Sequence, residues 1–421
     1  MELTNDNKFV EASLKRIASF IKMEMVSCKR KSSDRTLSER QVVPKPYLIL
    51  GPAGVGKTTS IRALAEELGI GYRTISLVDY AEADLTGVPQ VVDGRTSFAP
   101  TDVFPRVDRD GEFGILVIDE ITCASDAMQA TVLPLSNQDN RGIGQYKLPK
   151  GWVPIFLGNG KSDGGAFVGL KGALINRCSC WRAVSDVEDW KKYALKHNVH
   201  PAVLGFIASR PDLLLKFDPY DEPTQSPSPR AWTRLSDSLL DYEEILTKID
   251  DEDVSLLAQA NVGVEAGLSF GAFYAYRNQM LDINKILSGE LNADNTPWQQ
   301  LNNEVGYLTA SSLAFVTAKL SNRAKELHQI DRHFTRTPEG KEIQDMMCYV
   351  GNWIAGCIEK KSVDMGITIL TMMLDNISEY QGVDGSFFGT DTGENGEEIP
   401  TKCPALVNVL QEHFNELNIT L

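Results

Sequence analysis

Hydrophobic and polar positions divide the chain into a front part with short apolar runs and a rear part with helical spacing. Five short runs of mainly apolar residues, bounded by glycine or polar residues, are typical of buried strands. They lie at residues 47–50, 72–77, 114–119, 152–157 and 178–184. Helical spacing falls between runs, as at residues 61–68, which Gly69 closes. This alternation favours an α/β fold.

Helical stripes flank this region on both sides. The first stripe covers residues 9–25, and the basic run 29–35 after it is interpreted as a solvated linker, with a partner-docking patch as the alternative. Past residue 186 the spacing predicts helices at 186–197, 202–209, 228–240, 251–260, 264–287, 311–327, 341–359, 362–380 and 404–418. The Gly- and acid-rich segment 382–398 is typical of a flexible loop.

A glycine-rich turn joins the first predicted strand to its helix. It fits the pattern G-x-x-x-x-G-K-[ST] and reads Gly51, Pro52, Ala53, Gly54, Val55, Gly56, Lys57, Thr58, Thr59. The phosphates of a nucleotide must be wrapped by backbone N–H groups at the start of a helix, so side chains in the turn would obstruct them. Lys57 supplies a positive charge for the β and γ phosphates, and Thr58 offers a hydroxyl to Mg²⁺. The turn therefore predicts a nucleotide site.

Polar residues follow two later strands. Asp119 and Glu120 end the run 114–119, where one carboxylate suffices to hold the waters around Mg²⁺. Glu120 is then free to orient and deprotonate an attacking water. Asn159 follows the run 152–157, at the strand end where α/β sheets bind ligands, and could contact the γ phosphate or the water. A turn-forming Asn-Gly is the alternative interpretation of Asn159.

Two segments of the front part predict projecting insertions. The long interval 84–105 contains Asp93-Gly94, a hairpin signal, so we expect a small β insertion there. The polar, glycine-containing segment 137–149 also suggests a hairpin. Further along, Arg230 stands at a predicted helix start, where it is unfavourable for the helix dipole. A nearby anion would explain it.

Composition narrows the classes of function. The 421 residues are 42% hydrophobic and 24% charged, which is globular, and the net charge of −15 argues against a protein that coats DNA. The polar N-terminus and the lack of a long apolar run predict a soluble protein with no membrane span. Seven cysteines without C-x-x-C pairs fit free thiols in the cytoplasm. Neither Cys178 with Cys180 nor His197 with His200 is expected to bind a metal.

The motifs together carry a family likeness. The phosphate loop, Ile-Asp-Glu, Leu-Gly-Asn, Ala-Leu-Ile-Asn-Arg and Ser-Pro-Arg-Ala-Trp occur over residues 45–240 in the order and spacing of AAA+ ATPases of the MoxR group. The chain thus resembles the bacterial or phage type of the helix-2-insert clade. The resemblance implies that Asn159 is the sensor-1 residue, Arg230 the sensor-2 arginine and Arg177 the arginine finger that reaches a neighbouring subunit. Arg182 is a weaker finger candidate because it lies within the fifth strand.

This resemblance also implies an architecture and an assembly. It implies an α/β P-loop AAA+ core with a parallel five-stranded sheet, an all-α lid and a helical C-terminal extension. We expect an N-terminal helix and linker at 1–40, the core at 41–185, the lid at 186–300 and the extension at 301–421. The implied assembly is a homo-oligomer, usually a hexameric ring, that hydrolyses ATP with Mg²⁺. A protein substrate, or a partner with a von Willebrand factor A domain, is implied as well.

Three functions remain open at this stage. The first is an ATP-driven motor that remodels a protein. The second is a nucleic-acid motor or restriction-type NTPase, which the acidic balance disfavours. The resemblance implies that segments 84–105 and 137–149 are the helix-2 insertion and the hairpin before sensor 1, which point toward a central pore, and a basic pore lined by Arg95, Lys147 and Lys150 would favour this second function. The third is a nucleotide-regulated scaffold that binds ATP with little turnover. The presence of Asp119 with Glu120, Asn159 and Arg230 argues against it.

Overall fold

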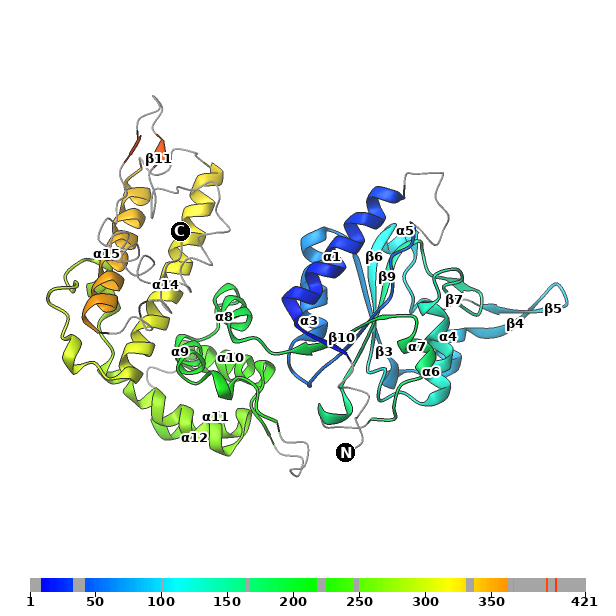
Figure 1. The fold of residues 1–421 in the computed structure, drawn as a ribbon, viewed down its shortest axis with the longest axis horizontal. Helices are drawn as coiled ribbons and strands as arrows, with labels where there is room; N and C mark the ends of the chain where they lie inside the picture. Colours follow the sequence, from blue (N-terminus) through cyan, green and yellow to red (C-terminus); the bar gives the residue numbers. More distant parts are fainter. Residues whose placement is uncertain are drawn as a thin grey trace. The chain divides into compact units, whose positions relative to one another are not determined.

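A computed structural model of the chain describes residues 9–32, 42–99, 101–163, 167–217, 225–245, 250–330, 337–361, 366, 391–392 and 398–399. The chain divides into two compact units, both drawn in Figure 1. The first comprises Met1–Asp186, Phe217–Pro223 and Ser228–Arg230, and the second Val187–Lys216, Thr224–Pro227 and Ala231–Leu421. Each unit has buried hydrophobic clusters of its own.

The first unit is built on one parallel sheet of six strands. Their order across the sheet is β1-β10-β2-β9-β6-β3. The strands are β1 (Val10–Ser13), β2 (Tyr47–Leu50), β3 (Gly71–Ser76), β6 (Phe113–Asp119), β9 (Gly151–Gly158) and β10 (Ser179–Val184). Strands β2 and β9 are buried along their whole length, as expected of central strands with helices on both faces. The predicted α/β fold with a parallel sheet is confirmed.

The strand number is a correction, because we predicted five strands and the sheet has six. The additional strand is β1, which pairs in parallel with β10 at the sheet edge. A helix was predicted from residue 9, but α1 (Leu14–Lys31) begins after this strand, where the Ser13 side chain accepts a hydrogen bond from the N–H of Arg16. Without β1, the outer backbone groups of β10 would have no partner in the sheet. The pairing supplies hydrogen-bond partners for them, which explains the extra strand.

Helices cover both faces of this sheet (Figure 1). On one face α1 and α3 (Lys57–Leu68) bury Ile17, Ile21 and Ile61 against it. On the other face lie α4 (Glu82–Thr86), α6 (Asp126–Val132) and α7 (Gly172–Ile175), which contribute Leu85, Met128 and Leu174. A further short helix is α5 (Val107–Asp110). In sheets layered in this way, ligands bind at the carboxyl ends of the strands.

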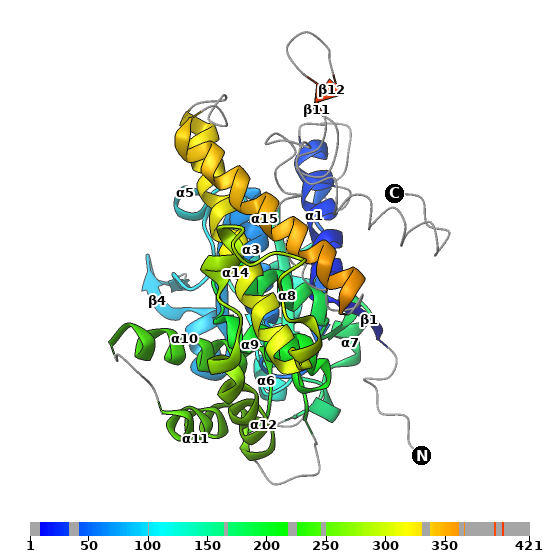
Figure 2. The ribbon, with the colours of Figure 1, turned by 90° about the vertical axis from the view of Figure 1, so that its left-hand side faces the viewer.

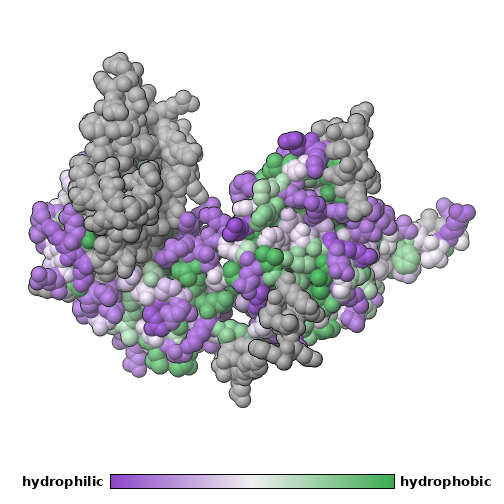
Figure 3. All heavy atoms as spheres, viewed as in Figure 1, coloured by the Kyte–Doolittle hydropathy of each residue, from purple (hydrophilic) through white to green (hydrophobic). Residues whose placement is uncertain are grey.

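Both predicted insertions are antiparallel hairpins. Strands β4 (Val88–Val92) and β5 (Arg95–Ala99) turn at Asp93 and Gly94, whose φ angles of 51° and 73° are the left-handed values that a two-residue hairpin turn needs. This hairpin projects from the first unit and mixes polar and apolar surface (Figure 3). The second hairpin pairs β7 (Gly142–Ile143) with β8 (Tyr146–Lys147). The two predictions are confirmed.

The second unit is mainly helical in its described part. Its helices are α8 (Val187–Lys196), α9 (Pro201–Ser209), most of α10 (Pro229–Ile245), α11 (Asp251–Val262), α12 (Val264–Tyr274), α13 (Ile283–Leu287), α14 (Asn303–Ile330) and α15 (Pro338–Lys360). Short 3-10 helices in the two units are η2 (Leu77–Asp79), η3 (Leu133–Ser136), η4 (Lys161–Asp163), η5 (Pro211–Leu213), η6 (Ala275–Gln279) and η7 (Trp298–Gln300). Figure 2 shows the long helices α14 and α15 side by side.

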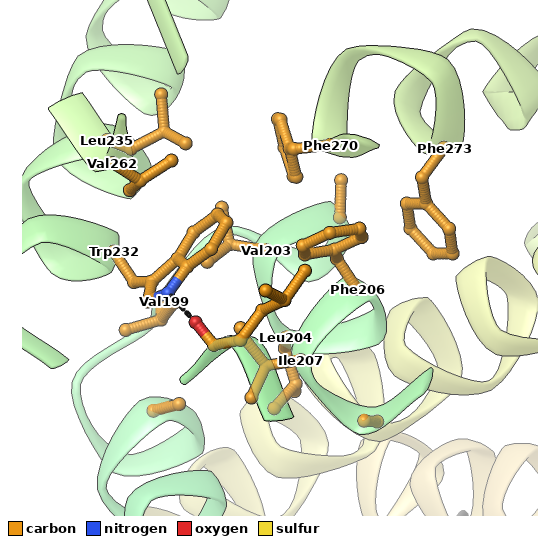
Figure 4. Close-up of a cluster of buried hydrophobic side chains, with 14 of the residues drawn as sticks. Val199, Val203, Leu204, Phe206, Ile207, Trp232, Leu235, Val262, Phe270 and Phe273 are labelled. Carbon is orange, nitrogen blue, oxygen red and sulfur yellow. Dashed lines mark hydrogen bonds between the residues drawn. The ribbon is translucent and has the colours of Figure 1, made fainter. Parts of the chain in front are cut away.

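An aromatic core holds α9, α10 and α12 together (Figure 4). The ring of Phe206 lies 5.4 Å from that of Trp232 and meets that of Phe270 edge-on at 5.5 Å. Trp232 is fully buried, and its Nε1 donates a hydrogen bond to the backbone oxygen of Leu213 at 2.8 Å. Leu308 of α14 joins the same core, so the described start of the predicted extension packs within this unit.

The described rear part also departs from the sequence prediction. The helix predicted at 264–287 is broken, because α12 ends at Tyr274 and α13 begins after Asp282, whose carboxylate accepts from two N–H groups of the new helix. The patterns at 311–327 and 341–359 correspond to α14 and α15. Apart from Gly366, the patterns at 362–380 and 404–418 lie outside the described residues. Within the predicted loop 382–398, β11 (Asp391–Thr392) pairs with β12 (Glu398–Ile399).

Candidate functional site

The glycine-rich turn lies between β2 and α3 and leaves the start of α3 open. Gly54 and Gly56 have φ angles of 77° and 99°, and Gly56 caps α3 without a side-chain hydrogen bond. Among the described residues, the N–H groups from Gly54 to Thr58 have no hydrogen-bond acceptor. Unpaired N–H groups at the start of a helix form an anion site.

Other members of the turn are held by the sheet. The N–H of Gly51 donates to the backbone oxygen of Gly158 at 3.2 Å, and a Cβ on Gly51 would lie 2.7 Å from the oxygen of Ala183. Val55 is buried, whereas Ala53 and Thr59 are exposed. The turn is therefore anchored at its first residue, and Ala53 and Thr59 lie at the surface.

Lys57 is buried, with 9% of its surface exposed. Its Nζ donates to the backbone oxygens of Gly51 at 2.7 Å and Pro52 at 3.0 Å, and to Oδ1 of Asn159 at 3.0 Å. Burial lowers the pKa of Lys57 to about 8, against the opposing effect of nearby carboxylates. The ammonium thus lies inside the loop, bonded to neutral oxygens that a phosphate could replace.

Thr58 and Asp119 meet beside Lys57. The Thr58 hydroxyl donates to Oδ2 of Asp119 at 2.8 Å. Hard oxygen atoms such as these suit Mg²⁺, which keeps several waters and needs only one or two protein ligands. This pair could supply two oxygen ligands to a cation. Among the described residues, no group of three or more His, Cys, Asp or Glu side chains is placed to hold a metal.

Asn159 reaches this group from the end of β9. An ammonium can only donate, so the atom facing Lys57 must be the amide oxygen. The amide NH₂ then points elsewhere and has no acceptor in the described ranges. The Asn159 N–H donates to the hydroxyl of Thr122 at 3.1 Å, which fixes the backbone. The amide is thus available to donate to an anion or a water.

Glu120 follows Asp119 in a left-handed conformation with φ of 57°. This conformation is rare for a residue with a side chain and occurs often at functional sites. Oε2 of Glu120 accepts a hydrogen bond from the Cys123 thiol at 3.2 Å. Burial and Glu120 raise the pKa of Cys123, so the thiol stays protonated and donates. Cys123 was not identified from the sequence. Its position three residues after Glu120 is the only sequence signal that could have indicated this contact.

The three arginines differ in position. The Arg230 N–H donates to the backbone oxygen of Gly54 at 3.1 Å, and the charge of Arg230 is close enough to lower the pKa of Lys57. Arg177 is exposed just after α7, and its side chain forms no hydrogen bond or ion pair with the described residues. Arg182 is paired with Asp163 of the same chain at 2.5 Å. That pairing disfavours Arg182 as a finger, and no described contact brings Arg177 to the loop.

Comparisons with known proteins support part of this description. Residues 46–148 match the family model described as the AAA domain, dynein-related subfamily. No match was found among curated proteins. Among the described residues, no helix has both the length and the apolar character required to cross a bilayer.

Solved structures similar to the chain include three mutants of Thermotoga maritima RuvB. Their identities are 14%, 12% and 13%, with TM-scores of 0.35, 0.35 and 0.32. The alignments cover 65%, 100% and 96% of this chain and 74%, 100% and 95% of those chains. Because these TM-scores are low, we base no structural or functional argument on the similarity to these proteins.

Proposed function

We propose that this chain, whose residues 46–148 match an AAA domain, is a Mg²⁺-dependent ATPase that converts ATP and water to ADP and phosphate. The observation that carries the proposal is the convergence of Lys57, Thr58, Asp119 and Asn159 at the open start of α3. The four residues come from three separate segments of the sequence. Their meeting beside unpaired N–H groups suits a triphosphate.

The proposed chemistry assigns each residue one task. Loop N–H groups and Lys57 bind and orient the phosphates, and Thr58 with Asp119 would hold Mg²⁺, which when bound neutralises phosphate charge. Glu120 accepts a proton from the attacking water and orients it toward the γ phosphate. Asn159, with its free amide NH₂, contacts that phosphate or the water.

The two remaining arginines complete the proposal. Arg230 contacts the phosphates from the start of α10, and its N–H already bonds to Gly54. Arg177, which is exposed in the described chain, donates to the nucleotide of a neighbouring copy and stabilises charge in the transition state. Hydrolysis then requires a ring, which we propose to be a MoxR-like hexamer in the cytoplasm.

The work of the proposed ring is to remodel or assemble a protein partner in a chaperone-like manner. Within each copy we propose the N-terminal segment 1–40, core 41–185, lid 186–300 and extension 301–421. The partner class, including proteins with a von Willebrand factor A domain, rests on the sequence resemblance. The net charge of −15 supports a protein partner over nucleic acid.

Glu120→Gln and Lys57→Ala test the ATPase. We expect Glu120→Gln to bind ATP and lose turnover by about 10²- to 10⁴-fold, and Lys57→Ala to lose binding, because the first removes a base and the second a phosphate contact. Phosphate release and fluorescent-nucleotide titration measure the two effects. Lys22→Ala, which removes an exposed lysine that pairs with Glu67, is the control.

Normal turnover by Glu120→Gln would contradict its assigned role. The partner class is tested by assaying the wild-type ATPase with and without DNA, and by recovering proteins bound to Glu120→Gln with ATP. Strong stimulation by single- or double-stranded DNA would instead favour a nucleic-acid motor.

A further inference from the structure

We infer that Asp163 and Arg182 form a positioning pair. They fix the turn that follows Asn159, and this keeps the Asn159 side chain in contact with Lys57. The inference rests on the proposed ATPase, because it assigns these two residues a part in the same reaction. Neither of them contacts Lys57 directly in the described structure. They act through the backbone that carries Asn159.

Asp163 fixes the turn immediately after Asn159. Only 6% of Asp163 is exposed, and its Oδ2 accepts from the N–H of Gly160 at 2.7 Å. The Asp163 N–H in return donates to the backbone oxygen of Gly160 at 3.0 Å. These two hydrogen bonds join Gly160 and Asp163 in a tight turn directly after Asn159. The Asn159 backbone is therefore held by Thr122 on one side and by Asp163 on the other.

Arg182 fastens this turn to the strand beside the phosphate loop. It lies on β10 opposite Leu50, the last residue of β2 before the loop. Its Nη2 donates to Oδ1 of Asp163 at 2.5 Å and to the hydroxyl of Ser162 at 3.3 Å. On the outer side, Nε lies 3.8 Å from a carboxylate oxygen of Glu11 on β1. One guanidinium thus links the turn after β9 to β10 and to the edge strand β1.

Stability alone does not explain this pair. Replacing a buried ion pair by apolar residues is often neutral or stabilising, because desolvation offsets the attraction. In this pair Nη1 of Arg182 is also buried and has no hydrogen-bond partner among the described residues, which adds a cost. A costly pair beside a site is expected where geometry has to be kept within a fraction of an ångström.

The experiment separates positioning from folding. Asp163→Asn and Arg182→Met each leave one buried charged or polar partner unpaired, so each should lower the melting temperature. The double variant Asp163→Asn with Arg182→Met removes both charges and should regain most of the melting temperature. Its kcat should nevertheless stay about 10- to 100-fold below that of the wild type, because Asn159 is no longer held.

Two further measurements make the test specific. Measured at about pH 6, where Lys57 stays charged even without the effect of Asp163 on its pKa, the affinity for ATP should change by less than about threefold in the double variant, because the loop and the Lys57 side chain are retained. Arg182→Lys keeps a charge for Asp163 and should recover part of kcat. The matched control is the double variant Arg73→Met with Asp110→Asn, which removes another ion pair of the first unit, at 3.0 Å, and should keep kcat.

Each outcome decides between the proposals. A double variant with wild-type kcat overturns the positioning role and leaves the ATPase proposal intact. An equal loss of kcat in the Arg73 and Asp110 control also overturns it, since the effect would then be general. If the wild-type chain neither binds nor hydrolyses ATP, the ATPase proposal fails and the positioning role fails with it.

Discussion

Raising the pH should weaken ATP binding, because Lys57 loses its proton and with it the positive charge that attracts the phosphates. Burial holds the pKa of this lysine at about 8 in the nucleotide-free chain, below its ordinary value of 10.5. Phosphates beside the ammonium favour the charged form, so the bound chain keeps its proton to higher pH. Binding above pH 8 therefore requires uptake of a proton, and affinity falls as the pH rises.

The size of the effect follows from the pKa. At pH 9 about one tenth of the Lys57 side chains would be charged, so affinity should be about tenfold lower than at pH 7, which is about 1.4 kcal/mol. Asp119, Glu120 and Asp163 raise the pKa of Lys57, and Arg230 lowers it. Phosphate itself has its second pKa near 6 and is fully ionised there.

Titration of a fluorescent ATP analogue between pH 7 and 9.5 measures the slope. Lys57→Arg is the decisive comparison, because arginine stays charged over this range and should give a flat profile at lower affinity. Lys22→Met, at an exposed position on α1, should follow the wild type. A wild-type affinity that does not change from pH 7 to 9.5 would refute the reasoning.

Two other variants test the assembly and the helical core. Arg177→Ala should retain ATP binding and lose about 10³-fold or more in kcat, and mixing it with Lys57→Ala chains should partly restore phosphate release, because those chains still donate Arg177. No recovery in mixed assemblies would argue against action across an interface. Trp232→Ala should lower the free energy of unfolding by about 3–5 kcal/mol in chemical denaturation, because the indole is fully buried. Tyr242→Ala, at an exposed position of the same helix, should change it by no more than about 0.5 kcal/mol, and an equal loss there would contradict the assignment of the core.

Features dictated by local backbone rules were predictable from the sequence. The glycines at 54 and 56 adopt positive φ, and the Asp93-Gly94 turn is left-handed at both residues. Lys57, Thr58 and Asp119 were likewise predictable, because each belongs to a short motif attached to an apolar strand. Their meeting in space follows because β2 and β6 run parallel on either side of β9, with their carboxyl ends at the same edge of the sheet.

Features that depend on distant partners were not predictable. Val10–Ser13 reads as the start of a helical stripe, and only the free edge of β10 turns it into a strand. Arg182 was considered solely as a finger, because nothing near it in the sequence indicates that Asp163 is its partner. Cys123 was missed for a related reason, since its role depends on the direction of the Glu120 side chain.

The uncapped start of α3 has a consequence for the folding of the nucleotide-free protein. Most helices gain free energy from a side chain that satisfies their first N–H groups, and Gly56 offers none. A bound phosphate would supply those missing acceptors, so the ligand would act as the cap that the sequence omits. Nucleotide binding and the stability of the first turn of α3 are then linked, so that a bound nucleotide would stabilise a turn that is already helical without it.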